Sequence, residues 1–327
     1  MNSLYKMFFY KIFKLLLFPI KKIVHLFIKK RKIIILFRRS NSLGDNIILT
    51  GIIKQVAQKV NNKIILFTNF PEIFENNNKI YKVFNLKKKK LLSFFLKLIE
   101  GDNIFEMNKE FEGYKDALDY LRNEKSIIKK KYENRHLAEF ISGNLHKELK
   151  FENFKNEIFF NDYEIKNFEI KFKNLIKTNF VIVNPHTRIE FTPNKGWGFE
   201  NFQKLVDISD FNWCQVGNKN DRKLNNVNYY LDLNLRELFY LVSEAKFLVS
   251  NEGYLNHIAS SFEKKIYVIK PGIVPKEYFS YKNTIAIERD PPIECSPCYL
   301  KTPCLKKERY CMTDIKPEKA KLFLDTK

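Results

Sequence analysis

The fold follows from residues 181–207, which read VIVNPHTRIEFTPNKGWGFENFQKLVD. The apolar run 180–183 predicts a buried strand, a polar loop follows it, and an amphipathic helix is predicted over residues 199–208. In open α/β sheets, ligands bind beyond the carboxyl ends of the strands, which is where such a loop lies. The stretch therefore predicts an α/β fold with a candidate binding loop at the edge of its sheet.

This loop carries the side chains that usually neutralise a phosphate or diphosphate. They are a hydroxyl, a guanidinium, an imidazole and an ammonium, from Thr187, Arg188, His186 and Lys195. The start of the helix that follows adds its own partial positive charge. A phosphate site is one interpretation, and an ordinary surface loop in a basic protein is the other.

The rest of the chain alternates between strands and helices. Strands are predicted at 33–37, 63–68, 81–86, 103–107, 157–160, 213–217, 229–233, 247–250 and 266–269, and helices at 46–60, 114–123, 135–147, 163–177, 235–245 and 254–262. This alternation predicts parallel sheets, and 327 residues are enough for two domains. We expect a first α/β domain over 32–165, a linker helix over 166–178, and a second domain over 179–327 that ends in a helix.

The charge balance is strongly basic. Lys and Arg number 58 against 37 Asp and Glu, a net charge of +21. Such a charge favours an anionic partner, either a nucleic acid, an acidic lipid or a phosphorylated substrate. The sequence has no recognised nucleic-acid motif or aromatic stacking pattern, so we expect no nucleic-acid partner. An apolar content of 45% supports folded cores.

Residues 1–31 predict a basic amphipathic helix. Residues 1–40 hold eleven Lys or Arg and no acidic residue, and the longest uncharged run, 15–20, is too short to span a bilayer. The interrupted apolar region also makes a poor signal peptide. On a helical wheel the basic side chains share an arc of about 100°; these are Lys11, Lys14, Lys21, Lys22, His25, Lys29 and Lys32. The helix lies either on an anionic membrane surface or on the protein itself.

Two further loops combine glycine with ionisable side chains. In Ser42-Leu43-Gly44-Asp45, Gly44 permits a tight turn and Asp45 could accept a proton from a hydroxyl nucleophile. Alternatively, Ser42 caps the helix and Asp45 serves only the helix dipole.

The second loop, residues 250–259, follows an apolar strand and opens a helix. It places a carboxylate, exposed amides and an imidazole together, at Glu252, Gly253 and His257. A single histidine on a helix is equally compatible with a structural role.

Four of the five cysteines form a cluster near the C-terminus. Cys295 and Cys298 are separated by two residues, and Cys304 and Cys311 follow after five and six. Four thiolates could hold a structural zinc ion with no open position. Reduced structural thiols and adventitious disulfides are the alternatives. The odd total, with Cys214 alone in an apolar strand, indicates a reducing compartment.

Five segments resemble glycosyltransferase family 9, the heptosyltransferase-like enzymes of lipopolysaccharide synthesis. In chain order they are residues 39–45 (RSNSLGD), 183–187 (VNPHT), 195–202 (KGWGFENF), 250–259 (SNEGYLNHIA) and 295–315, where Cys-x-Pro-Cys is followed by two more cysteines. The resemblance runs from residue 33 to the C-terminus and leaves out the basic N-terminal helix. It implies an enzyme of the GT-B fold, with two Rossmann-like domains facing across a cleft.

The resemblance also implies an inverting transfer that requires no metal, and the sequence contains no Asp-x-Asp triplet. Asp45 becomes the candidate general base, in an acceptor loop that also holds Arg39, Ser42 and Gly44. The donor-binding candidates are Thr187, Arg188, Lys195, Glu252, Gly253 and His257. The family's Asp-Thr-Gly is replaced here by Glu252-Gly253-Tyr254, as in a variant branch.

The expected partners follow from this resemblance. The donor would be a nucleotide-sugar, ADP-heptose or a related compound, and the acceptor a lipid-linked or lipopolysaccharide-core hydroxyl. We expect a cytoplasmic protein, peripheral on the inner face of the cytoplasmic membrane. The alternative is a non-catalytic protein that binds a nucleotide-sugar or glycan on the same scaffold.

Overall fold

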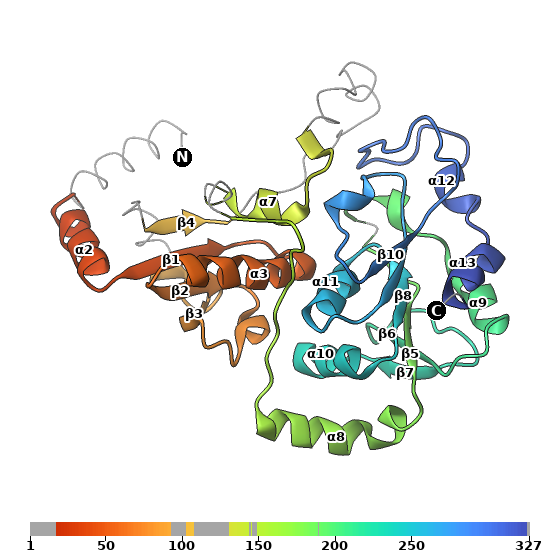
Figure 1. Cartoon of the computed structure of the whole chain (residues 1–327), viewed down its shortest axis with the longest axis horizontal. Helices are drawn as coiled ribbons and strands as arrows, with labels where there is room; N and C mark the ends of the chain where they lie inside the picture. Colours follow the sequence, from red (N-terminus) through yellow and green to blue (C-terminus); the bar gives the residue numbers. More distant parts are fainter. Residues whose placement is uncertain are drawn as a thin grey trace, which may run out of the picture.

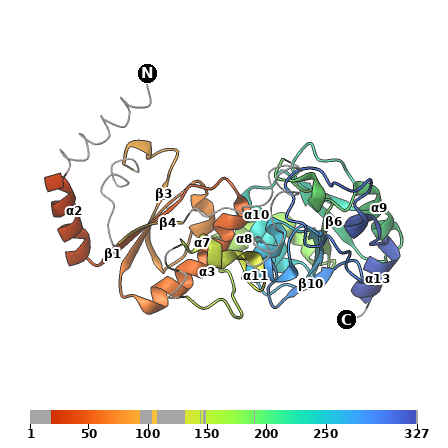
Figure 2. The ribbon, with the colours of Figure 1, turned by 90° about the horizontal axis from the view of Figure 1, so that it is seen from above.

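The computed structural model describes residues 18–92, 103–107, 131–143, 145, 149–188 and 190–325. Figure 1 shows two α/β units side by side, one built on a four-stranded sheet and the other on a six-stranded sheet. Every strand pair in both sheets is parallel. The first helix that the structure describes and the last one lie at opposite ends of the molecule (Figure 2).

The first sheet has the strand order β3-β2-β1-β4. Its strands are β1 (Ile33–Arg38), β2 (Lys63–Thr68), β3 (Ile80–Asn85) and β4 (Ile104–Glu106). Alternate side chains of β1 point to opposite faces, so both faces must be covered by apolar side chains. Ile34 and Leu36 pack with α3 (Leu43–Lys59), whereas Ile35 and Phe37 pack with Ile28 of α2 (Phe18–Lys30).

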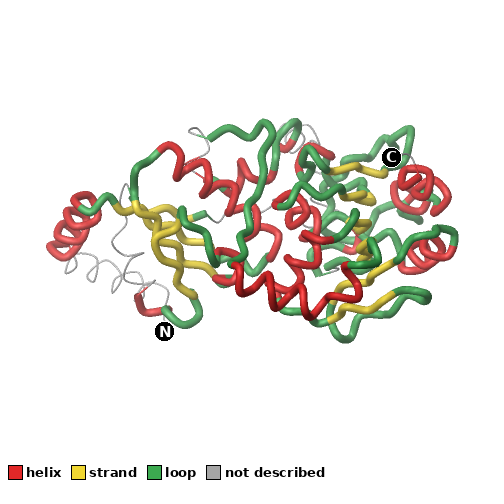
Figure 3. The backbone as a smooth tube through the Cα atoms, turned by 60° about the horizontal axis from the view of Figure 1, so that its bottom comes forward, coloured by secondary structure: helices red, strands yellow, loops and turns green. Residues whose placement is uncertain are grey.

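The second sheet has the strand order β10-β9-β8-β5-β6-β7 and is covered by helices on both faces (Figure 3). Its strands are β5 (Val181–Asn184), β6 (Trp213–Gly217), β7 (Asn228–Leu231), β8 (Leu248–Asn251), β9 (Ile266–Ile269) and β10 (Thr284–Ile287). One face packs with α10 (Leu235–Glu244) and α11 (Tyr254–Ser261), and the other with α9 (Phe199–Asp207) and α13 (Pro317–Asp325).

The remaining helices are short or connect the two units. They are α7 (Leu137–Ile141), α8 (Asp162–Ile176), α12 (Tyr310–Thr313) and the 3-10 turns η1 (Pro71–Phe74), η3 (Pro193–Lys195) and η4 (Lys276–Tyr278). A capping box starts α8, because Asn161 accepts from the backbone of Glu164 and Glu164 accepts from that of Asn161. In Figure 1, α8 lies below the second unit and follows an extended segment that crosses over from the first unit.

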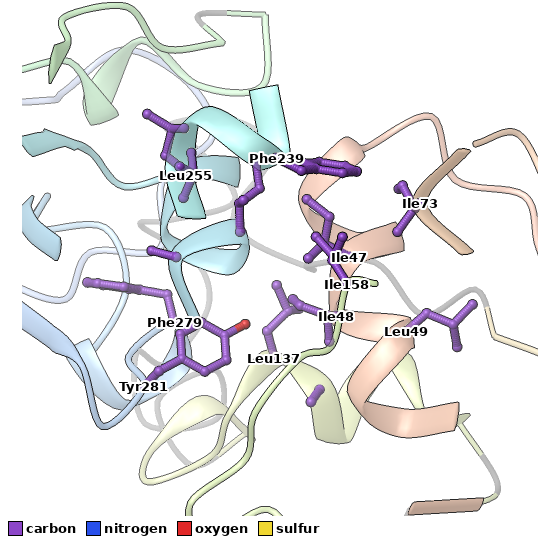
Figure 4. Packing of buried hydrophobic residues seen from close by; sticks show 14 of the residues in the cluster. Ile47, Ile48, Leu49, Ile73, Leu137, Ile158, Phe239, Leu255, Phe279 and Tyr281 are labelled. Atoms are coloured by element: carbon purple, nitrogen blue, oxygen red, sulfur yellow. The ribbon is translucent and has the colours of Figure 1, made fainter. Parts of the chain in front are cut away.

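One apolar core runs through both units. Ile47 and Ile48 of α3 belong to the same buried cluster as Phe239 of α10 and Leu255 of α11 (Figure 4). Helices α3 and α11 are in direct contact. Because each of these helices starts at the carboxyl edge of its own sheet, this contact brings the two edges together.

Three sequence-based assignments of structure need correction. Residues 157–160 are not a strand but an extended crossing segment, in which Ile158 is buried in the core shared by both units. The helix predicted over 135–147 is reduced to α7, because the left-handed Gly143 (φ 57°) follows directly after its end. The strand β10 was not predicted, and the helix predicted over 114–123 lies outside the described residues.

Candidate functional site

The two loops that carry glycine and ionisable residues meet where the units touch. Gly44 lies at the start of α3 and His257 in the first turns of α11. A Cβ atom added at Gly44 would lie only 2.7 Å from Cδ2 of His257, so the first loop packs directly against the second unit. Glycine is required at position 44 for this close approach.

The first loop is held rigidly at the end of β1. Ser42 caps α3, and its hydroxyl accepts from the backbone N–H of Asp45 at 3.4 Å. The buried Asn46 donates to the carbonyls of Ser40 (3.1 Å) and Ser42 (2.8 Å), and accepts from Thr68 at the end of β2. The capping role proposed for Ser42 is therefore present, and it leaves the carboxylate of Asp45 available for other contacts.

The charged residues of this loop are paired. Asp45 Oδ2 lies 2.6 Å from Nη2 of Arg38, the last residue of β1, whose side chain is completely buried. Arg39 points elsewhere and forms an ion pair with Glu106 at 2.6 Å. Sequence reasoning selected Arg39 for the acceptor loop, whereas Arg38 is the arginine that contacts Asp45.

The second unit contributes the loop that follows β5. Asn251, at the end of β8, donates to the carbonyl of Pro185 and accepts from the N–H of Trp197, both at 2.9 Å. Asn184 donates to the hydroxyl of Tyr254 at 2.9 Å. These buried amides fix the loop to the neighbouring strand, because unpaired buried polar groups would be costly.

Lys195 and Glu252 form an ion pair in this unit. Their side chains are 17% and 7% exposed, so the pair is largely desolvated. The ammonium group of Lys195 also lies 4.8 Å from the centre of the Phe191 ring, and Lys301 lies 5.7 Å from the same ring. The sequence did not identify Lys301, which comes close to this loop only through the fold.

The other donor candidates have fewer contacts. Arg188 is exposed, and the methyl group of Thr187 lies 3.4 Å from the position a Cβ atom would take at Gly196. A Cβ atom at Gly253 would meet no atom nearer than 4.0 Å, so the space beside its α-carbon is open. The structure therefore brings Lys195, Glu252 and Gly253 together, and it places Arg188 on the surface.

His257 is buried and neutral. Burial, and then the nearby charge of Lys195, lower the pKa of His257 to about 3. Its Nδ1 lies 2.7 Å from the hydroxyl of Tyr281, which already accepts from Asn156 at 3.1 Å. The hydroxyl of Tyr281 therefore engages Nδ1, while Nε2 is the ring nitrogen on the side of Gly44.

The tyrosine that departs from the family motif has a defined place. Tyr254 is the first residue of α11, and burial raises the pKa of its phenol to about 12 although Asn184 donates to it. It therefore stays protonated and can donate one hydrogen bond at the carboxyl edge of the second sheet.

The clustered cysteines influence one another electrostatically. Burial, and to a smaller extent the neighbouring Cys311, Cys295 and Cys304, raise the pKa of Cys298 to about 12. None of the four is in a disulfide. Among the residues that the structure describes, however, no three His, Cys, Asp or Glu side chains stand close enough together to hold a metal ion. The zinc site stays a prediction.

Comparison with known proteins identifies the architecture. No protein-family model matches this sequence, and no curated protein matches it significantly. A glycosyl transferase family 9 structure from Veillonella parvula DSM 2008 is similar over 89% of this chain and 95% of its own, with a TM-score of 0.64 and 11% identity. The chain has the GT-B fold.

Two Escherichia coli enzymes have the same architecture. ADP-heptose lipopolysaccharide heptosyltransferase II is similar over 89% of this chain and 97% of its own length, with a TM-score of 0.61 and 12% identity. The dodecameric iron-containing heptosyltransferase TibC, solved with ADP-D-β-D-heptose, covers 90% and 73% at a TM-score of 0.55 and 11% identity. The family 9 resemblance of the sequence motifs is thus confirmed at the level of the fold, whereas residue roles do not transfer at such identities.

Proposed function

We propose that this protein is a glycosyltransferase that moves a sugar from a nucleoside diphosphate to the hydroxyl of a lipid-linked or lipopolysaccharide-core acceptor. One observation supports the proposal: the loop of Asp45 in the first unit packs against His257 in the second, and His257 also lies near Lys195, the partner of Glu252. The proposed proton acceptor of one unit and the proposed diphosphate-binding cation of the other are therefore both close to His257. Heptosyltransferases with the same fold act on ADP-heptose, and we propose ADP-heptose or a related donor here.

The proposed reaction is a direct displacement with inversion. The acceptor oxygen forms a bond to the anomeric carbon while the bond from that carbon to the diphosphate oxygen breaks, and the diphosphate leaves with the electron pair. Asp45 takes the proton of the acceptor hydroxyl. Lys195 and the amides at the start of α11 stabilise the negative charge of the leaving group, so we propose that no metal is required.

The substitution Asp45→Asn tests this assignment. Loss of the general base should lower the rate of sugar transfer by about 10²–10⁴-fold, while the affinity for the nucleotide-sugar remains close to that of the wild type. The donor is first identified by the rise in melting temperature with ADP-, UDP-, GDP- and CDP-sugars. Asp162→Asn is the matched control, because Asp162 is also a first-turn carboxylate of a helix, far from the site. Full activity in Asp45→Asn would contradict the proposal.

A non-catalytic nucleotide-sugar-binding or glycan-binding protein is the second candidate. The ion pair between Lys195 and Glu252 favours this non-catalytic alternative, because the ammonium group that would bind a phosphate is already paired with a carboxylate. This alternative predicts a melting-temperature rise with a nucleotide-sugar but no release of nucleoside diphosphate in the presence of truncated lipopolysaccharide.

We also propose that the protein sits on the inner face of the cytoplasmic membrane through α2. This helix buries Ile28 against the sheet but leaves Ile23, Leu26 and Phe27 exposed by 67%, 68% and 54%. At 3.6 residues per turn these three share an arc of about 100°. The exposed Lys22 and Lys29 flank this arc on one side, and the exposed Lys30 lies within it at the end of the helix, which suits anionic lipid headgroups.

In the part of the chain that the structure describes, no helix combines the length and apolarity needed to cross a bilayer. The double substitution Leu26→Ser/Phe27→Ser tests surface binding without touching the buried Ile28. Sedimentation with phosphatidylglycerol-containing vesicles should fall about tenfold or more, given roughly 1.5–3 kcal/mol for each large apolar side chain. The control Ile170→Ser removes a side chain that is 75% exposed on α8 and should bind like the wild type. Unchanged sedimentation of the double variant would contradict the proposal.

A further inference from the structure

Arg38 is a fully buried guanidinium beside the proposed general base. It ends β1, and its relative exposure is 0%. Its Nη1 donates to the carbonyl of Met107, which directly follows the neighbouring strand β4. Its Nη2 donates to Asp45 Oδ2 at 2.6 Å. Burying a guanidinium is costly unless it is paired and hydrogen-bonded, so these partners hold it in a single place.

The carboxylate of Asp45 is held through only one of its oxygens. Oδ2 accepts from Arg38 and also from the hydroxyl of Ser40 at 3.3 Å. Among the described residues, Oδ1 has no hydrogen-bonding partner, and the Asp45 side chain is 21% exposed. One oxygen is therefore fixed to the protein while the other remains available to a ligand.

The carboxylate of Asp45 lies close to the second unit. The preceding residue, Gly44, packs against His257 of the second unit, so Asp45 lies at the junction of the two units. His257 has its Nδ1 engaged by Tyr281 and is neutral, so it does not compete with Arg38 for the negative charge of Asp45. Arg38 is thus the cation that directly contacts Asp45.

We propose that Arg38 is a positioning residue for the transfer reaction. It fixes Oδ2, which leaves Oδ1 to accept the proton of the acceptor hydroxyl as the oxygen–carbon bond forms and the diphosphate leaves. This inference rests on the proposed function of Asp45. The planar guanidinium reaches the carboxylate and the Met107 carbonyl through two different nitrogens, which a single ammonium group does less well.

The test is a double-mutant cycle with Asp45, using the donor identified by melting temperature and truncated lipopolysaccharide as acceptor. Arg38→Met alone should lower kcat by about 10²-fold, because a misplaced catalytic group loses that much, with little change in the donor's KM. Arg38→Lys should recover part of the rate. In the Asp45→Asn background, Arg38→Met should cause no further loss, because the residue acts through Asp45. Additive losses in the double variant would overturn the proposal.

A second measurement keeps the idea testable without any acceptor. The signal of the Asp45 carboxyl carbon is followed by NMR of aspartate-labelled protein and assigned by its absence in Asp45→Asn. In Arg38→Met this signal should change its chemical shift, because the carboxylate loses the hydrogen bond from Nη2 of Arg38. Arg289→Gln, which breaks a 2.7 Å pair with Asp314, is the control and should leave it unchanged.

These outcomes separate two failures. If Asp45→Asn keeps full activity, the proposed function of Asp45 fails whatever Arg38 does. If Asp45→Asn is inactive while Arg38→Met keeps the wild-type rate and the wild-type signal of the Asp45 carboxyl carbon, the positioning role of Arg38 fails alone. Donor affinity equal to that of the wild type in each variant establishes that the variant is folded.

Discussion

Lys195 should contribute both to the stability of the fold and to binding of the donor, and substitutions of Lys195 and its partner Glu252 should distinguish the two contributions. Both side chains are largely buried, at 17% and 7% exposure. In Lys195→Met, the apolar stem that lies near Phe191 is retained but the charge is lost. Glu252 is then left as a buried carboxylate without a counter-charge. We expect the unfolding free energy to fall by about 3 kcal/mol, the lower end of the range for buried ion pairs that lose one partner.

The same substitution should also weaken binding of the donor. A charge-assisted contact to phosphate contributes about 1.5–3 kcal/mol. At about 1.4 kcal/mol per tenfold change, the Kd for ADP should rise roughly 10- to 100-fold. In the double variant Lys195→Met/Glu252→Gln both partners are neutral, so the unfolding free energy should largely return while the affinity for ADP does not.

The assays are urea unfolding and calorimetric titration with ADP, on the wild type, both single variants and the double variant. Glu252→Gln alone should bind ADP more tightly than the wild type, because it removes a carboxylate that competes for Lys195. Wild-type affinity for ADP in Lys195→Met would refute the placement of the diphosphate. Recovery of that affinity in the double variant would show that the loss came from the unpaired carboxylate of Glu252 rather than from the missing ammonium group.

Two further predictions concern protonation and metal. Burial lowers the pKa of His136 and His257 to about 3 from the ordinary 6.5, so between these values the unfolded chain binds more protons than the folded one. Their stabilising contribution is fully present above pH 6.5 and decreases as the pH falls, by about 3–4 kcal/mol between pH 7 and pH 5 in urea titrations; a flat profile would contradict it. We propose a structural zinc ion held by the cysteine cluster. Metal analysis should find about one zinc per chain, lost in Cys295→Ser/Cys298→Ser and kept in the buried control Cys214→Ser; metal-free wild type would exclude it.

The elements best predicted from sequence are the buried strands. Strands β2, β6 and β9 have the predicted bounds because short apolar runs between polar segments suit parallel strands covered on both faces. Residues 157–160 have similar composition but were assigned wrongly. Ile158 is buried, and Phe160 partly buried, by packing in the core that both units share, a contact to which local periodicity gives no clue.

In the candidate site too, residues in local sequence motifs were proposed from the sequence, whereas residues defined by distant contacts were missed. Asp45, Lys195 and His257 were identified because each stands in a recognisable loop between a strand and a helix. Arg38 was missed because a basic residue at the end of a strand carries no local sign of its partners. One of these, the carbonyl of Met107, is 69 residues away. Tyr281, whose hydroxyl contacts Nδ1 of His257, is likewise 24 residues further along the chain.

The separation of these groups between two units makes their relative placement part of the proposed chemistry. Asp45 belongs to the first unit and the Lys195–Glu252 pair to the second, so a small rotation would separate the proposed proton acceptor from the proposed diphosphate site. Arg236 of α10 opposes such a rotation. It is 8% exposed and donates to the carbonyl of Glu72 in the first unit at 3.3 Å and to Glu164 at the start of α8 at 2.8 Å. Its buried charge is stable only while both units supply these acceptors, so the placement that brings Asp45 to His257 is also the one that satisfies Arg236.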